Sequence, residues 1–353
     1  MGMLFGNCMS LIANLYPLLK PWLFRMDAEK AHEWTTRMMR VAHGLGMLTA
    51  GQEKLPQMPV ECLGLKFPNG LGLAAGMDKS ASAVEAWAAL GFGFVEVGTL
   101  TPRPQPGNPK PRLFRLPEHD ALINRMGFNN PGIDAAVKRL ARRKTKAVVG
   151  VNIGKNFDTP NERAVDDYLI GLRKAYPVAD YVAVNISSPN TKGLRDLQAE
   201  DSIRALLSAL KNEQSKLASE YGHQKPVLVK IAPDLDGQQI EALARVFNEL
   251  SVDGVIATNT TISRESVAGH PLQKEAGGLS GAPVRDRSTL VIQALRMLLK
   301  EETPIIGVGG ILCGQDALAK RQAGAQLVQV YSGLVFRGPA LVHDVVRAIA
   351  EQG

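Results

Sequence analysis

The sequence has few of the residues that build metal centres and disulfide frameworks. It contains three cysteines in 353 residues, Cys8, Cys62 and Cys313, which lie far apart and without CxxC spacing. Its six histidines show no HExxH or related spacing. These absences argue against a zinc site or an iron–sulfur cluster, and they are typical of a reducing compartment. We therefore expect no metal.

The excess of basic over acidic residues is small, and aromatic residues are few. There are 41 basic and 34 acidic residues, a net charge of +7, and aromatic residues make up 5% of the chain. The densest basic run, residues 138–144, has no aromatic residue within it. It is more typical of a solvated helix end than of a surface on which nucleic-acid bases stack. The modest excess of basic residues is compatible with attraction to an anionic membrane or to acidic ligands. We expect no nucleic-acid partner.

The N-terminus lacks an uninterrupted hydrophobic run. Residues 1–19 carry no charge, but Asn7, Ser10, Asn14 and Pro17 interrupt the apolar pattern. A transmembrane helix needs about 20 predominantly apolar residues, and a signal peptide needs a basic start and a cleavage site that are absent here. The segment instead predicts short amphipathic helices on a membrane, or a helix packed on the rest of the protein. The apolar face would comprise Leu11, Leu15, Leu18, Leu19, Trp22 and Leu23.

The rest of the chain alternates between strand and helix patterns. Apolar runs typical of buried parallel strands lie at 70–75, 93–98, 147–152, 180–185, 226–231, 253–258, 304–308 and 326–331. Helical patterns lie between most of them, at 80–90, 161–175, 199–221, 237–250, 287–300 and 338–351. Eight such strands predict an α/β fold, a (β/α)₈ TIM barrel over residues 51–353, preceded by a small helical, membrane-associating domain over residues 1–50. The long connections 99–131 and 259–285 are expected to build or cover an active site.

Polar side chains or glycines follow almost every predicted strand. The segment NISSPNT, residues 185–191, concentrates uncharged donors and acceptors directly behind a buried strand. Planar amides suit a flat, polar, ring-shaped ligand, although an Asn/Ser-rich turn alone explains the segment taken by itself. The same kind of residue recurs at the other strand ends, which favours one shared site.

Glycine-rich turns follow the last two strands, in GVGG (307–310) and at Gly333. Such turns hold phosphate in barrels through backbone N–H groups, and Gly281 could add a further donor. A dinucleotide-binding unit would need an acidic residue about 20 positions further on. No acidic residue lies between Ala317 and His343, so a mononucleotide such as FMN is favoured.

The sequence resembles the dihydroorotate dehydrogenase family, in its membrane-associated, quinone-linked class (class 2), over essentially the whole chain. The resemblance rests on the motifs AAGMDK (74–79), NRMGFNN (124–130), NISSPNT (185–191), VLVKIAPD (227–234), ATNTT (257–261), GVGG (307–310) and VYSG (330–333). It implies an FMN-dependent oxidoreductase acting on a CH–CH bond. Dihydroorotate would be oxidised to orotate in pyrimidine biosynthesis, with a membrane quinone as the final acceptor.

The resemblance also assigns binding residues. FMN would contact Ala75, Gly76, Met77, Asp78, Lys79, Thr99, Asn152, Asn185, Lys230, Thr258, Gly281, Gly310, Tyr331 and Ser332. Lys230 would face the N1–C2 edge of the flavin and stabilise negative charge on the reduced ring. The substrate would contact Lys79, Asn124, Arg125, Met126, Gly127, Phe128, Asn185, Asn190, Asn259 and Thr260.

Ser188 is implied as the base that removes a proton from substrate C5, and its proton would leave through Thr191 or an ordered water. The cytosolic class has Cys at this position, so serine favours the quinone-linked class. His32, Arg115 and Tyr331 match the family's quinone-proximal positions, although an interhelical role would also explain His32. The absence of an Arg- and Ser-rich transit segment favours a bacterial protein, peripheral on the cytoplasmic side of the inner membrane. We expect a monomer.

Two other functions share part of this pattern. Another FMN barrel, a dihydropyrimidine- or tRNA-dihydrouridine-type reductase, would share the flavin site but lack NRMGFNN together with NISSPNT. It would show NADPH-dependent activity. A non-redox phosphate-binding barrel would share only the glycine turns and would purify colourless.

Overall fold

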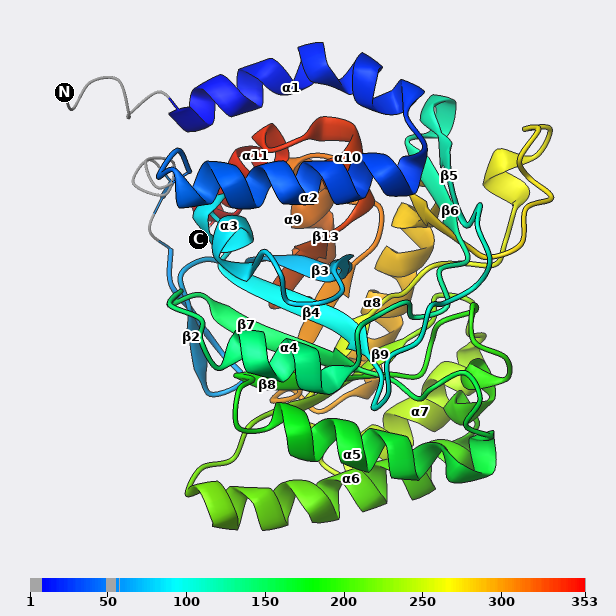
Figure 1. Ribbon diagram of the computed structural model, residues 1–353. Coiled ribbons are helices and arrows are strands. Elements are labelled where there is room, and N and C mark those ends of the chain that lie inside the picture. The colour runs from blue at the N-terminus through cyan, green and yellow to red at the C-terminus, as the bar shows by residue number, and fades with distance from the viewer. Residues whose placement is uncertain (1–7, 49–54, 57, 353) are drawn as a thin grey trace.

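The computed structural model describes residues 8–48, 55–56 and 58–352, which form a barrel with two helices laid against it (Figure 1). These helices are α1 (Cys8–Arg25) and α2 (Ala28–Gly44). Asp27 begins α2, because its side chain accepts a hydrogen bond from the backbone N–H of Lys30 at 3.0 Å. The pair runs across the molecule beside α3 and α11 (Figure 1). The predicted domain boundary at 50/51 lies outside the described residues.

The predicted (β/α)₈ barrel is confirmed. Eight parallel strands close on themselves in chain order: β3 (Leu71–Asp78), β4 (Phe94–Leu100), β7 (Val148–Ile153), β8 (Tyr181–Asn185), β9 (Val227–Ile231), β10 (Gly254–Ala257), β12 (Ile305–Val308) and β13 (Leu327–Val330). Each of the eight lies within a few residues of a predicted apolar run. Because all strands run the same way, their C-terminal ends meet at one mouth.

Helices surround this sheet. They are α3 (Val84–Ala89), α4 (Ile133–Leu140), α5 (Ala164–Ala175), α6 (Glu200–Tyr221), α7 (Gly237–Glu249), α8 (Arg285–Leu298), α9 (Gly314–Gln322), α10 (Ser332–Arg337) and α11 (Ala340–Glu351). A capping box between Asp236 and Gln239 begins α7. The basic run at 138–144 includes the last turn of α4 and the residues after it, as predicted.

Alternate residues of each strand fill the barrel interior. Large apolar side chains such as Phe94 and Tyr181 pack there, with ring centroids 6.4 Å apart. A short hairpin of β1 (Val60–Cys62) and β2 (Leu65–Phe67) precedes the barrel. Phe67 of this hairpin packs edge-on against Phe94 at 5.2 Å, so the hairpin closes the end opposite the mouth.

The two long connections contain strands that the sequence did not predict. The connection after β4 forms a hairpin of β5 (Leu113–Leu116) and β6 (Ala121–Asn124), and β11 (Gly278–Gly281), from the connection after β10, pairs with β6. These strands have four residues each, too few for a clear period-2 pattern. The first barrel strand also runs to Asp78, beyond the predicted end at 75, through a register shift between Leu73 and Asp78.

We predict that Gly150→Ala destabilises the protein by about 1–3 kcal/mol, because overpacking a filled core costs that much. A Cβ at Gly150 would lie 2.1 Å from Cζ of the buried Tyr181 ring. Gly237→Ala is the matched control, since nothing lies within 4 Å of its Cβ position. Urea unfolding of both variants checks this, and equal unfolding midpoints would contradict the packing described here.

Candidate active site

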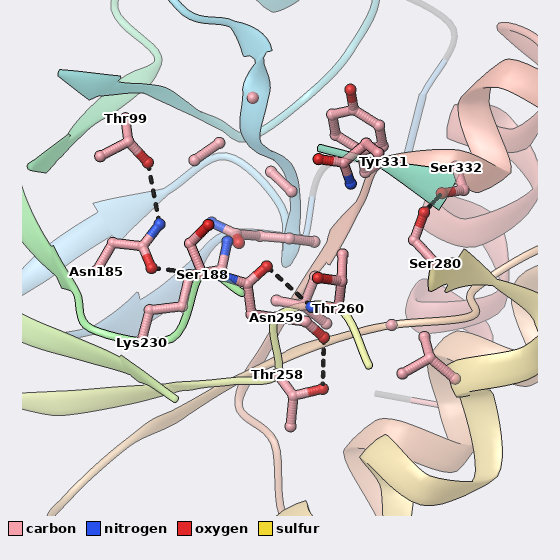
Figure 2. A pocket seen from close by; sticks show the side chains of 18 of the residues that line it. Thr99, Asn185, Ser188, Lys230, Thr258, Asn259, Thr260, Ser280, Tyr331 and Ser332 are labelled. Carbon is pink, nitrogen blue, oxygen red and sulfur yellow. Dashed lines mark hydrogen bonds between the residues drawn. The ribbon is translucent and has the colours of Figure 1, made fainter. Parts of the chain in front are cut away.

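A pocket at the mouth of the barrel brings together most of the predicted ligand-binding residues (Figure 2). Seven of the eight barrel strands, or the turns that follow them, contribute to its wall, β7 being the exception, and the β5–β6–β11 sheet forms a further side. Predicted residues that line it are Ala75, Gly76, Lys79, Thr99, Asn124, Met126, Gly127, Phe128, Asn185, Ser188, Asn190, Lys230, Thr258, Asn259, Thr260, Gly281, Gly310, Tyr331 and Ser332.

A chain of hydrogen bonds fixes the amide groups of this pocket. Asn185 donates from Nδ2 to Thr99 Oγ1 at 3.0 Å, and Thr99 donates to Asn152 Oδ1 at 2.6 Å. Asn152 in turn donates to Glu96 Oε1 at 2.8 Å. Asn259 donates to Asn185 Oδ1 at 3.3 Å. Each amide therefore has a fixed orientation before any ligand binds, which favours recognition of a rigid polar ring.

The only charged pair inside the described barrel interior lies beneath these amides. Lys230 Nζ is 3.9 Å from Glu96 Oε1, and both side chains are almost fully buried. Burial lowers the pKa of Lys230, and the nearby Glu96 carboxylate opposes this shift. Glu96 also accepts hydrogen bonds from Tyr181 at 2.9 Å and Gln329 at 2.8 Å. The pair presents a cation to the pocket, held by a fully hydrogen-bonded acid.

Ser188 lies in the loop after β8, next to the polar wall. Its Oγ accepts a hydrogen bond from the backbone N–H of Asn190 at 3.2 Å, and Asn190 donates from Nδ2 to Asn124 Oδ1 at 3.0 Å. Thr191 is buried, and its Oγ1 has no hydrogen-bond partner among the described residues. Ser188 and Thr191 therefore do not hydrogen-bond directly in this structure. Of the two predicted routes for the proton, the one through an ordered water remains.

Lys79 is a second lysine that lines the pocket, in the turn after β3. Burial lowers its pKa to about 8, while Glu29 on α2 opposes that shift. Glu29 is itself buried and paired with Arg112, whose guanidinium lies 2.7 Å from Glu29 Oε1. Lys79 is thus a desolvated lysine facing a pocket, suited to an anionic ligand.

The other end of the pocket is built from backbone and hydroxyl groups. Gly281 and Gly310 both have positive φ, at 95° and 71°, and a Cβ at either position would clash with neighbouring backbone. Ser280 and Ser332 join this end through their hydroxyls, 2.7 Å apart. Backbone N–H groups and hydroxyls of this kind bind phosphate.

Several buried polar atoms of the pocket have no hydrogen-bond partner within the described residues. They are Asn190 Oδ1, Thr260 Oγ1 and Gln329 Oε1. Because buried polar groups are nearly always hydrogen-bonded, these atoms indicate partners supplied by a ligand. A flat ring with N–H and C=O groups and a phosphate tail fits the amides, Lys230 and the glycine turns. These residues therefore fit a flavin mononucleotide.

A second, apolar cavity of about 320 Å³ lies between α1, α2 and the barrel. The structure brings all three predicted quinone-proximal residues, His32, Arg115 and Tyr331, to its wall. Tyr331 lines both this cavity and the polar pocket. Burial raises the pKa of Tyr331 to about 12 and lowers the pKa of His32 to about 4, so both side chains are neutral near pH 7. The apolar cavity thus adjoins the polar pocket at one shared side chain.

Four predicted site residues lie outside the wall of the polar pocket. Asn152 lies behind Thr99, and Asp78 accepts hydrogen bonds from the backbone of Ser82 and Ala83. Met77 faces the apolar cavity. Arg125 pairs with Glu275 at 2.5 Å and stacks on Phe114.

The sequence interpretation missed three residues, Glu96, Gln329 and Ser280. Glu96 and Gln329 lie inside apolar strands, in FVEVG and LVQVY. A polar residue within such an apolar run could have indicated that each has a role in the barrel interior. Ser280 lies in β11, a strand that was not predicted, and only its neighbour Gly281 was expected at the phosphate site.

Known proteins resemble this chain over nearly its whole length. The sequence model of the family described as dihydroorotate dehydrogenase matches residues 57–352. A dihydroorotate dehydrogenase (quinone) of Chromobacterium violaceum is 59% identical over 337 residues, covering 96% of this chain and 98% of the relative. One from Stenotrophomonas maltophilia is 58% identical over 336 residues, covering 95% and 96%. The crystal structure of DHODH from Eimeria tenella in complex with ferulenol has a TM-score of 0.84 at 39% identity, covering 91% of each chain. The chain therefore belongs to the dihydroorotate dehydrogenase family.

Proposed function

We propose that the polar pocket holds FMN with dihydroorotate against it, and that the electrons leave through the apolar cavity. The protein oxidises dihydroorotate to orotate in pyrimidine biosynthesis, with a quinone as the acceptor. The observation that carries the assignment of the two sites is the position of Tyr331, which lines both the polar pocket and the apolar cavity. Two substrates of opposite polarity could thus reach one cofactor from separate sides.

Within this flavin-dependent family, we propose FMN as the particular flavin that binds. Its phosphate would bind the glycine turns at Gly281 and Gly310 and the hydroxyls of Ser280 and Ser332. Lys230 would face the ring edge on which negative charge collects, and Glu96 would hold its ammonium in place. When bound, the flavin supplies the acceptor for the hydride that leaves the substrate.

Dihydroorotate is a cyclic ureide with a carboxylate, and the pocket offers matching groups. The planar amides of Asn124, Asn190 and Asn259 could pair with the ureide edges. Lys79 could pair with the carboxylate. The predicted contact of Arg125 is less direct, because its guanidinium is engaged by Glu275.

Ser188 would hold and pass on the proton from substrate C5. Its Oγ already accepts one hydrogen bond, from Asn190 N–H, so its own proton is free to be directed away from the substrate. An ordinary serine hydroxyl is a weak base, so proton removal requires a concerted relay to water in a shielded site. The buried Oγ1 of Thr191 could orient that water.

Ser188→Ala should slow flavin reduction by dihydroorotate about 10²–10⁴-fold, the usual contribution of a positioned base. Orotate binding, read from the shift of the flavin spectrum, should stay unchanged, and Ser188→Cys should keep part of the rate. Anaerobic stopped-flow absorbance makes the measurement. A Ser188→Ala enzyme that is bleached at a near-normal rate would refute the assignment.

The affinity for orotate should fall as the pH rises through about 8, the lowered pKa of Lys79. A lysine is cationic below its pKa and neutral above it, so the attraction for the carboxylate is lost on the alkaline side. The dissociation constant should rise by up to about tenfold per pH unit above that value.

Spectral titration with orotate between pH 7 and pH 9 measures this dependence. Lys79→Met should bind orotate weakly with little change over the same range. Lys66→Met, on the exposed surface of β2, should retain the dependence. A Lys79→Met protein with an unaltered pH profile would remove Lys79 from the site.

We further propose that the protein acts as a monomer, bound peripherally to the cytoplasmic face of the inner membrane. Within the described residues, none of the helices is long and apolar enough to cross a membrane. Large apolar side chains are exposed on α1 and α2 next to the apolar cavity, among them Leu18 at 75%, Trp22 at 50% and Val41 at 49%. Such a surface suits a bilayer interface, from which a quinone could enter the cavity.

Replacing both Leu18 and Trp22 by Glu should prevent binding to lipid vesicles, because each change places a charge in the bilayer interface. Reduction of the flavin by dihydroorotate should continue at the normal rate. Met297→Glu, at a 76% exposed position on α8, is the matched control and should still bind. Co-sedimentation with vesicles gives the answer, and an undiminished bound fraction for the double variant would exclude this surface.

A further inference from the structure

A third cavity, polar and open to solvent, lies on the other side of α2 from the apolar cavity. Its volume is about 560 Å³, and its rim carries exposed charged residues such as Glu33, which is 63% exposed, and Arg37. Two polar side chains, His32 and Thr36, line both this cavity and the apolar one. They stand one helical turn apart on α2, so they share one face of the helix.

The environments of these two side chains differ from those of ordinary core residues. Thr36 Oγ1 is buried and has no hydrogen-bond partner among the residues that the structure describes. His32 hydrogen-bonds to the backbone of Met77, the third residue shared by the two cavities. A neutral imidazole both donates and accepts a hydrogen bond, and a hydroxyl does the same. Together they form a polar strip between solvent and an otherwise apolar cavity.

The chemistry of the reaction requires a proton from solvent on the quinone side. Oxidation of dihydroorotate releases the C5 proton at Ser188 and transfers the C6 hydrogen with two electrons to the flavin. Reduction of a quinone to a hydroquinone consumes two electrons and two protons. The hydride equivalent supplies two electrons and one proton, so the second proton must come from water.

We propose that His32 and Thr36 conduct this second proton from the solvent-open cavity to the quinone. The proposal rests on the quinone site proposed above. Burial and the nearby Lys79 lower the pKa of His32 to about 4, so the imidazole is neutral. Its N–H donates to the Met77 carbonyl, and its other nitrogen accepts a hydrogen bond, which orients a water that passes the proton along the strip. Substrate-side and quinone-side protons then travel by separate routes, one at Ser188 and one along α2.

The test uses the flavin-loaded enzyme, reduced by dihydroorotate without oxygen and then mixed with decylubiquinone in H₂O and in D₂O. Thr36→Val, which keeps the shape of the side chain, and His32→Asn, which keeps a hydrogen-bond donor, should slow reoxidation about tenfold or more. Both should raise the solvent deuterium isotope effect of this step. Thr36→Ser should restore both the rate and the isotope effect.

Two measurements separate a proton route from a packing effect. Thr35→Val is the matched control, because Thr35 lines the apolar cavity but is not among the residues that line the polar one. Its isotope effect should equal that of the unaltered enzyme. Quinone binding is read from quenching of Trp34 and Trp87, two of the chain's three tryptophans, which both line the apolar cavity. This binding should be unchanged in Thr36→Val.

The outcomes distinguish the two proposals. If quinone does not quench the tryptophans of the unaltered protein, the quinone site itself is wrong. If quenching is normal but Thr36→Val and His32→Asn both leave the reoxidation rate and isotope effect unchanged, the proton route is overturned and the quinone site stands.

Discussion

The buried pair of Lys230 and Glu96 is the constraint around which the active pocket is organised. A cation inside a barrel is tolerated only when an acid and further hydrogen bonds compensate its desolvation. Glu96 provides this compensation, since Asn152, Tyr181 and Gln329 donate to it while Lys230 stands 3.9 Å away. The same acid is the anchor of the amide chain through Asn152, Thr99 and Asn185. One carboxylate therefore sets both the charge beneath the pocket and the orientation of its polar wall.

The two helices before the barrel add a second environment beside this polar one. They enclose an apolar cavity against α3, α10 and the β5–β6 hairpin, and Tyr331 stands between it and the pocket at the barrel mouth. The buried pair of Glu29 and Arg112 joins α2 to the connection after β4. Glu29 also acts on Lys79 electrostatically, so the position of α2 influences the charge of a residue that lines the pocket at the barrel mouth. Glu29 of α2 thus links the helical segment to the barrel through its interactions with Arg112 and Lys79.

Much of the site could be predicted because parallel strands end at a common mouth. Once eight apolar runs are recognised, Thr99, Asn185, Lys230 and Thr258 must lie near one another whatever the details of the loops. Residues carried on irregular connections were less predictable. Ser280 reaches the pocket through β11, a strand of four residues that pairs with β6, about 155 positions earlier in the chain.

The sequence by itself determined the barrel, the family and the ring of polar strand ends, because strand periodicity and motif order are local properties. Tertiary structure decided which of those residues line the pocket or support its wall. Asn152 and Asp78 satisfy neighbouring protein groups, whereas Gln329 and Glu96 emerge as parts of the site. It also decided that His32 and Thr36 lie between two cavities, since their position depends on how α2 packs across the barrel (Figure 1). Long-range packing of this kind leaves no local pattern in the chain, because the partners of each side chain come from distant segments.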